Sequence, residues 1–559
     1  MSRAPSTLAL FHKFLLLLAI TGKRRSFQST LLGMIEFFFA GLPIVVLVVL
    51  MTKPNPLSAP LAFFLAALCA FLVRSIYFHA EVSLLSAAIV AGLLEALTPI
   101  SIVFGAIFFF VALEKSGAMN VLQAWLRGIS SNRVAQLMLV GWAFVFLIEG
   151  ACGFGTPAAL AAPILVALGF PAVPVLLLCL IFNAIPTVFG AVGTPIWFGF
   201  ELLQLKPPEL IDIGGRTALL QSIVALIIPV ISLRLIVDWA TIRRNLIFIY
   251  LSVFSCVGPM LAVASINYEF PAVVGGVVGL ITTILLARFE IGLERPEIGR
   301  ARGPLLSRRV ALALTPLAVT VVILLVTRIP NLGLRNLLTS PEPNLGVSLG
   351  AFGEVTVSPS LVFQFRDILG QGLNWSHAFL YIPSLIPFFL TAALAFVLFR
   401  SPVGTTSLAM RETVARIGKP VVALFGALVF VNLLMVGGER SSTMILGHSL
   451  AYVTGGAWKY FAPFLGALGS FFSGSTTISN LTFGGIQASI AHDVGTDPGI
   501  LLALQCAGAA MGNIIAIHNI VAASAVLMLA NVEGEILKAA FPVVLLYGLT
   551  LALATAILF

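Results

Sequence analysis

The stretch Glu149-Gly-Ala-Cys-Gly-Phe-Gly-Thr-Pro157 decides the fold, because it sets an acidic side chain and three glycines between two long apolar runs. Three more polar stretches interrupt apolar sequence in the same way: Asn183-Ala-Ile-Pro-Thr-Val-Phe-Gly-Ala-Val-Gly-Thr-Pro195, Phe472-Ser-Gly-Ser-Thr-Thr-Ile-Ser-Asn480 and Gly512-Asn-Ile-Ile-Ala-Ile-His-Asn519. We call the four stretches motifs 1 to 4 in chain order. At membrane depth, irregular backbone is tolerated only where it is buried in protein or lines a polar cavity. Because the interruptions recur in both halves of the chain, they predict broken helices around the binding site of a membrane transporter.

The composition supports a membrane protein. Of 559 residues, 59% are hydrophobic and only 9% are charged, and the mean hydropathy is +1.09. Soluble proteins have about 25% charged residues. The net charge of +9 does not indicate a nucleic-acid partner, because the Lys and Arg residues lie in short loops, where they set membrane topology. The five cysteines show no metal-ligand spacing.

Apolar runs long enough to be helices recur along the chain, and a complete span needs about 20 residues. They predict an all-α integral membrane protein, a polytopic bundle of about 12–16 transmembrane helices with two inverted repeats, re-entrant hairpins and broken helices. Hydropathy alone does not distinguish inverted from parallel repeats, and the inverted arrangement is favoured because the topology around the hairpin-like segments permits it. The candidate segments are 32–52, 57–76, 82–95, 98–113, 133–148, 158–169, 172–189, 217–237, 245–264, 270–287, 309–327, 377–399, 419–436, 443–455, 461–472, 480–491, 499–517, 519–531 and 538–558.

The basic loops predict the topology. Because even numbers of spans can separate them, the positive-inside rule puts all four in the cytoplasm: Lys115 to Arg133, Arg234 to Arg244, Arg288 to Arg309 and Arg400 to Lys419. With four spans before Lys115, the N-terminus is predicted to be cytoplasmic. The predicted regions are a basic N-terminal segment (1–30), a first membrane half with motifs 1 and 2 (31–327), an extracytoplasmic loop (328–375) and a second membrane half with motifs 3 and 4 (376–559).

Glu149 is the strongest single candidate, since an ionisable residue inside an apolar span is costly and indicates a functional site. Removal from water favours the protonated form of a carboxyl group, so Glu149 is predicted to be the proton-coupling residue. The alternative is a hydrogen-bonded Glu149 that caps the helix break without titrating. The glycines after it, with Pro157, predict an unwound segment and a new helix N-terminus able to bind an anion.

The other polar residues of the motifs are predicted to bind substrate through hydroxyl, amide and backbone N–H groups. Three alternatives stay open: the hydroxyls bond back to their own helices, the glycines serve helix packing, and His518 links helices. The predicted substrate-binding residues are Gly153, Gly155, Thr156, Asn183, Thr187, Gly193, Thr194, Ser473, Ser475, Thr476, Thr477, Ser479, Asn480, Asn513, His518 and Asn519.

At the four motifs the chain resembles the L-lactate permease family of bacterial secondary transporters. The resemblance covers nearly all of the chain after about residue 30. The matching residues are Glu149–Pro157 with Ala158-Ala-Leu-Ala-Ala-Pro-Ile-Leu-Val-Ala-Leu-Gly-Phe170, Asn183–Pro195, Phe472-Ser-Gly-Ser475 with Ser479-Asn480, and Gly512-Asn513 with His518-Asn-Ile-Val-Ala-Ala523.

The resemblance implies proton-coupled uptake of lactate, glycolate and related 2-hydroxymonocarboxylates across a bacterial or archaeal plasma membrane. Many members carry Asp after Ser-Gly-Ser, where this chain has Thr476. If that Asp couples an ion in those members, then in this chain either Glu149 has the larger share of ion coupling or the coupled ion is a different one. The expected partners are a monocarboxylate and the lipid bilayer, with no cofactor beyond the proton, and homodimerisation is left open.

Two alternatives remain. The first is a transporter of the same fold that uses Na⁺ or carries another small anion. The second is an integral-membrane enzyme, for which only Glu149 and His518 offer acid/base groups, so an enzyme is not expected. The chain has no P-loop, metal-ligand cluster or nucleophile–base signature, which disfavours an ATP-driven pump.

Overall fold

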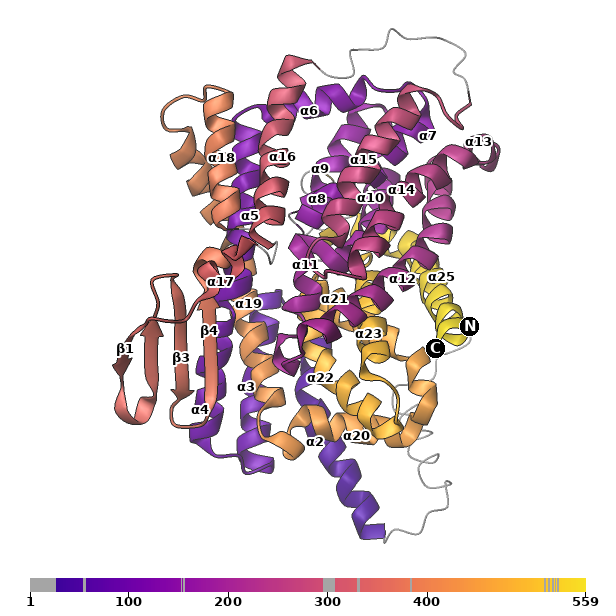
Figure 1. Ribbon diagram of the computed structural model, residues 1–559. Coiled ribbons are helices and arrows are strands. Elements are labelled where there is room, and N and C mark those ends of the chain that lie inside the picture. The colour runs from indigo at the N-terminus through magenta and orange to yellow at the C-terminus, as the bar shows by residue number, and fades with distance from the viewer. Residues whose placement is uncertain are drawn as a thin grey trace.

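The computed structural model describes residues 27–559 apart from 54–56, 152, 154–155, 295–306, 329–331, 383–384, 517–518, 521–522, 525–526, 528 and 530–531. These residues form a helical bundle with one small antiparallel sheet on its flank (Figure 1). The sequence-based prediction of a helical polytopic membrane protein is confirmed, with the sheet as an addition.

The helices of the first half coincide closely with the apolar runs of the sequence. In chain order the elements are α2 (Phe27–Thr52), α3 (Ala59–Leu72), η1 (Val73–Tyr77), α4 (Val82–Glu95), α5 (Leu97–Lys115), α6 (Ala118–Arg127), α7 (Arg133–Gln136), η2 (Leu137–Phe144), α8 (Val145–Ala151), α9 (Thr156–Ala167), α10 (Ala172–Asn183), η3 (Pro186–Phe189), α11 (Gly190–Trp197), η4 (Glu201–Leu203), α12 (Pro207–Ser232), η5 (Leu233–Leu235), α13 (Trp239–Arg244), α14 (Leu246–Ala264), α15 (Pro271–Arg288) and α16 (Arg308–Arg328).

The second half begins with the sheet and continues as helices. In chain order its elements are α17 (Leu334–Thr339), β1 (Leu345–Ser348), η7 (Gly350–Phe352), β2 (Glu354–Val357), β3 (Val362–Ile368), β4 (Leu373–Ala378), η8 (Phe379–Tyr381), α18 (Ile386–Leu398), α19 (Thr405–Met435), η9 (Gly438–Arg440), α20 (Ser442–Thr454), η10 (Gly455–Tyr460), α21 (Ala462–Ser473), α22 (Thr476–Val494), α23 (Pro498–Asn513) and α25 (Glu533–Leu558).

Among the described residues, eight helices are long and apolar enough to cross a membrane, or ten if each of two bent pairs counts as one span. The sequence-based number of 12–16 is higher because it included apolar runs that are short helices here. Ile386–Leu398 and Ala462–Phe471 are two of these. In such segments a hydropathy maximum marks a buried helix that does not by itself cross the bilayer.

The number of candidate spans before Lys115 differs from the predicted number. The segments 82–95 and 98–113 were expected to be two spans, but α4 and α5 run on as one candidate span, Val82–Lys115. With Gly33–Met51 and Pro60–Tyr77, three candidate spans precede Lys115 instead of four. An odd number of spans would put the start of α2 and Lys115 on opposite sides of the membrane. The cytoplasmic N-terminus stays a prediction.

The sheet replaces the polar loop expected at 328–375. Its strands pair antiparallel in the order β1-β2-β3-β4, and β4 extends to Ala378, inside the segment expected to begin the next span. The aromatic and β-branched residues of Val362-Phe-Gln-Phe-Arg-Asp-Ile368 favour a strand. The sheet packs on α4, where Ala87 and Ala91 contact the strand residue Ile368. The sheet is therefore an integral part of the bundle wall.

The basic connections gather at one end of the bundle, where α6, α7, α13 and the start of α16 lie (top of Figure 1). Ion pairs tie this end together, because Lys115 Nζ lies 2.7 Å from Glu412 Oε2 and Arg416 Nη2 lies 3.2 Å from Glu114 Oε2. The sheet lies away from this end, beside α4 (Figure 1). This separation fits a cytoplasmic basic end and an outer sheet.

The orientation leads to the first prediction, which uses two exposed valines. Single cysteines at Val347 in β1 and Val403 in the connection before α19 are introduced after the five native cysteines are replaced by alanine. In intact cells an impermeant thiol reagent should label V347C, and V403C should react only after permeabilisation. The reverse pattern would contradict the assignment of the basic end to the cytoplasm.

Candidate functional site

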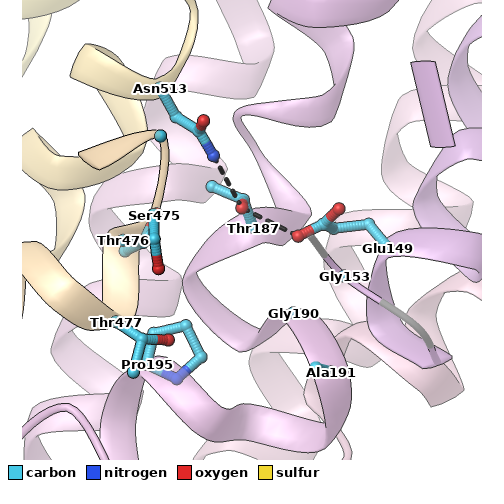
Figure 2. A pocket seen from close by; sticks show the side chains of 11 residues that line it. Glu149, Gly153, Thr187, Gly190, Ala191, Pro195, Ser475, Thr476, Thr477 and Asn513 are labelled. Atoms are coloured by element: carbon cyan, nitrogen blue, oxygen red, sulfur yellow. Dashed lines mark hydrogen bonds between the residues drawn. The ribbon is translucent and has the colours of Figure 1, made fainter. Parts of the chain in front are cut away.

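Residues of all four motifs meet around one small pocket in the middle of the bundle. Its volume is about 20 Å³, which is space for roughly one water molecule. Both halves of the chain face it, as Figure 2 shows. The lining residues are Glu149, Gly153, Thr187, Gly190, Ala191, Pro195, Gly474, Ser475, Thr476, Thr477 and Asn513.

Glu149 is placed by a helix that is buried on all sides. Residues 133–151 form α7, the π-helical segment η2 and α8 in succession. The helix packs closely on α15, because a Cβ atom at Gly150 would lie 2.6 Å from the backbone nitrogen of Val273. It ends where Gly153 takes a positive φ of 63° and its N–H donates to the Glu149 carbonyl oxygen. The helix end thus fixes the Glu149 carboxyl group inside the protein, where the side chain is 2% exposed.

The second wall of the pocket is a left-handed turn in motif 2. Ala191, Val192 and Gly193 have φ values of 45°, 58° and 71°. A positive φ is unfavourable for a β-branched residue such as Val192, so the surrounding structure must hold it. Two bonds do so: Trp197 Nε1 donates to the Val192 carbonyl oxygen at 3.0 Å, and Thr194 Oγ1 donates to that of Ala191 at 2.5 Å. This strained turn presents Ala191 to the pocket.

Motif 3 supplies a helix N-terminus. Gly474 ends α21 with a positive φ of 67°, and Ser475 caps α22 by accepting a bond from the Ile478 N–H at 3.3 Å. The first backbone N–H groups of a helix have no partner within the helix and favour an anion. The Thr476 hydroxyl in this turn is buried and has no hydrogen-bond partner among the described residues. This side of the pocket therefore offers donors.

A chain of hydrogen bonds crosses between the halves. Asn519 Nδ2 donates to Asn513 Oδ1, Asn513 Nδ2 donates to Thr187 Oγ1 at 3.2 Å, and Thr187 Oγ1 donates to Glu149 Oε1 at 2.8 Å. Figure 2 shows the last two bonds as dashed lines. The other carboxyl oxygen, Glu149 Oε2, is buried without a partner in the described part of the chain. Asn183 lies beside the same carboxyl group. One oxygen of the Glu149 carboxyl group thus accepts a hydrogen bond, and the other has no hydrogen-bond partner among the described residues.

Comparison with known proteins identifies the family of this chain. A family model described as L-lactate permease matches residues 36–559. The chain belongs to the L-lactate permease family. It is 43% identical to a putative L-lactate permease of Haemophilus influenzae over 525 residues, which are 94% of this chain and 99% of that protein. It is also 24% identical to the glycolate permease GlcA of Escherichia coli, over 90% of each chain.

Among solved structures, the YdaH transporter of Alcanivorax borkumensis is 17% identical to this L-lactate permease family member. The match covers 94% of this chain and 97% of that one, with a TM-score of 0.41. At that score the two folds are only distantly alike. The family membership therefore rests on the sequence.

The structure brings seven of the predicted site residues of this L-lactate permease family member to the pocket. They are Glu149, Gly153, Thr187, Ser475, Thr476, Thr477 and Asn513. Gly155, His518 and the side chain of Thr156 lie outside the described part of the structure. The pocket lining that sequence reasoning left out consists of motif residues without polar side chains, namely Gly190, Ala191, Pro195 and Gly474.

The remaining predicted residues lie around the pocket and do not line it: Asn183, Gly193, Thr194, Ser473, Ser479, Asn480 and Asn519. Several of their side chains donate hydrogen bonds to backbone carbonyl oxygens. This is the alternative to substrate binding that the sequence left open for the hydroxyls. Ser473 Oγ donates to the Gly469 carbonyl oxygen and Ser479 Oγ to that of Gly466. Asn480 Nδ2 donates to the Pro195 carbonyl oxygen at 2.9 Å, so it holds the strained turn of the other half. These residues position the pocket walls.

The contact between the halves gives the second prediction. Thr187→Val and Asn513→Ala each remove one partner of the 3.2 Å bond. Each should lower lactate uptake at subsaturating concentration, and the double variant should lose less than the two losses added. The difference should correspond to about 0.5–3 kcal/mol, as for residues in direct contact.

The control pairs Thr187→Val with Thr413→Val, whose hydroxyl donates to the Ala409 carbonyl oxygen in α19, away from the pocket. Those two changes should add. Simple additivity for the Thr187 and Asn513 pair as well would show that the bond does not couple the halves during transport.

Proposed function

We propose that this chain is a secondary active transporter that carries L-lactate and related small 2-hydroxymonocarboxylates, such as glycolate, together with protons across the plasma membrane of a bacterium or archaeon. The observation that carries the proposal is a buried carboxyl group, Glu149, in a pocket lined by both halves of the chain. The substrate class is taken from its relatives, a putative L-lactate permease and a glycolate permease. The proton is the coupling ion, and no other cofactor is proposed.

The pocket explains why substrate and proton would bind together. The donors at the start of α22 suit a substrate carboxylate, and Glu149 lines the same pocket. Two carboxylates that share one site cannot both stay ionised at low cost, so one takes up a proton. Binding of the substrate anion therefore favours protonation of Glu149. Release of the proton on the other side weakens substrate binding there.

The Thr187 and Asn513 side chains would supply the rest of the recognition. The Thr187 hydroxyl already donates to Glu149, and Asn513 donates to Thr187. A substrate 2-hydroxyl group can join such a network as donor and acceptor. The unpaired hydroxyl of Thr476 is a further donor on the α22 side. Apart from Glu149, the side chains proposed to recognise the substrate are thus uncharged.

The size of the pocket implies movement. A volume of about 20 Å³ admits a water molecule but no three-carbon acid. Lactate binding therefore requires the walls from motifs 1 and 2 to separate from those of motifs 3 and 4. Such relative motion of two halves around a central site is how secondary transporters alternate access.

The test is uptake of labelled L-lactate by the purified protein in proteoliposomes. Accumulation should follow an imposed pH gradient, acid outside, and should be insensitive to a sodium gradient. Accumulation that follows sodium alone would establish the alternative, a Na⁺-coupled transporter of the same fold. Absence of uptake under both gradients, with uptake of another small anion, would overturn the substrate assignment.

A further inference from the structure

A second and larger cavity lies between the sheet and the helices. Its volume is about 700 Å³, and its walls are strands β3 and β4 on one side and α4, α19 and η4 on the other. Glu95, Glu201 and Asn432 line the helix wall. Gln364, Arg366 and Trp375 line the sheet wall.

Opposite charges face each other across this cavity without pairing. Arg366 Nη2 donates to Gln364 Oε1 at 2.8 Å, and no carboxylate lies within 4.0 Å of its guanidinium among the described residues. Glu95 Oε2 accepts a bond of 2.6 Å from Asn432 Nδ2, and Glu201 is exposed. Trp375 Nε1 is buried and lacks a hydrogen-bond partner in the described part of the chain. The Arg366 guanidinium is therefore the cationic donor group of the sheet wall.

The sheet wall is fixed to the helices. His377 Nδ1 and Thr98 Oγ1 are hydrogen-bonded at 3.0 Å, and Phe365 and Trp375 pack with Ala91 of α4. Burial lowers the pKa of His377, so its imidazole is neutral at physiological pH and the bond does not depend on titration there. The strand that carries Arg366 is thus held beside the helices that carry Glu95 and Asn432.

We propose that this cavity is a second, outer binding site for the small 2-hydroxymonocarboxylate that enters the central pocket. The inference rests on the proposed function. The guanidinium of Arg366 binds the carboxylate, which planar guanidinium groups recognise with two parallel hydrogen bonds. The acidic wall repels the carboxylate and accepts a bond from the 2-hydroxyl group, so the substrate is oriented across the cavity.

The position of the cavity suits this role. The same short segment of chain borders both sites, because Pro195 lines the central pocket and Glu201 lines the cavity. The cavity is far larger than a three-carbon acid, so water stays in it and binding is weak. A weak site next to the segment that borders both cavities would hold the anion through the Arg366 guanidinium before it enters the central pocket.

The experiment compares Arg366→Gln with the wild-type protein in the lactate uptake assay, at low and at high ionic strength. Arg335→Gln is the matched control, because Arg335 is an exposed arginine of the neighbouring helix α17 that does not line the cavity. Arg366→Gln should raise KM about 10-fold at low ionic strength while kcat changes less than twofold. The difference should shrink at high ionic strength. Arg366→Lys should recover part of the loss.

Two outcomes separate this inference from the proposed function. A wild-type protein that takes up no lactate overturns the proposed function and the outer site with it. Normal wild-type uptake with the same KM in Arg366→Gln and Arg335→Gln overturns the outer site alone. A fall in kcat of Arg366→Gln without a rise in KM also overturns it, because that result assigns Arg366 to a step after binding.

Discussion

Accumulation of lactate driven by a pH gradient should fall in Glu149→Gln to the level of protein-free liposomes, while exchange of internal for external lactate persists. Glutamine has nearly the shape of glutamate, and its Oε1 can still accept the bond that Thr187 Oγ1 donates at 2.8 Å. The substitution therefore removes the titrating group and keeps the pocket geometry. Exchange involves no net proton movement, so it does not need that group.

Glu36→Gln is the control for this experiment. Glu36 is a carboxyl group in the apolar helix α2, and it does not line the pocket. Its removal should leave gradient-driven uptake intact. Full accumulation by Glu149→Gln would exclude Glu149 as the proton carrier. Loss of exchange together with accumulation would instead assign Glu149 to substrate binding.

The helices were the most predictable part of the fold. A bilayer admits only backbone that satisfies its own hydrogen bonds, so long apolar runs form helices wherever they occur. Breaks between runs were harder to interpret. The segments 82–95 and 98–113 were predicted as two spans, but the helices run on as one candidate span, Val82–Lys115. Asn432 of the distant helix α19 donates to Glu95 beside this break, and a single sequence does not show that contact.

The sheet shows a different limit. Residues that favour strands are present at 362–368, yet each strand has only four to seven residues and the segment is rich in Pro and Gly. Short strands give a weak periodic signal, and their stability comes from neighbours distant in the sequence. Here Ile368 packs on Ala87 and Ala91 of α4, which no local pattern reveals.

The site was predictable as motifs but not as contacts. Residues of all four motifs line one pocket, as expected if polar interruptions of apolar helices gather in the interior. Which hydroxyl faces the pocket depends on helical phase. Ser475 lines the pocket, whereas Ser473 and Ser479 bond to carbonyl oxygens of α21. The bond between Asn513 and Thr187 joins residues 326 positions apart, which a single sequence cannot show.

Gly190→Ala should lower pH-driven lactate uptake by about 10- to 100-fold without unfolding the protein. Gly190 has ordinary extended backbone angles, so alanine brings no conformational strain. A Cβ atom there would lie 2.3 Å from Glu149 Oε1, which is far closer than contact allows. The carboxyl group must shift and lose its bond to Thr187. A hydrogen bond to a charged group contributes about 1.5–3 kcal/mol, which corresponds to the stated loss.

A compensating change makes this prediction specific. In Gly190→Ala/Glu149→Asp the shorter side chain withdraws the carboxyl group from the new methyl group, so the double variant should transport better than Gly190→Ala alone. Gly258→Ala in α14 is the control, because nothing lies within 4 Å of a Cβ atom there, and it should transport like the wild-type protein. If Glu149→Asp worsens Gly190→Ala, the loss in Gly190→Ala does not arise from crowding of Glu149. The strained turn beside Gly190 would then be the element that transport depends on, since Ala191 and Val192 follow directly in the chain.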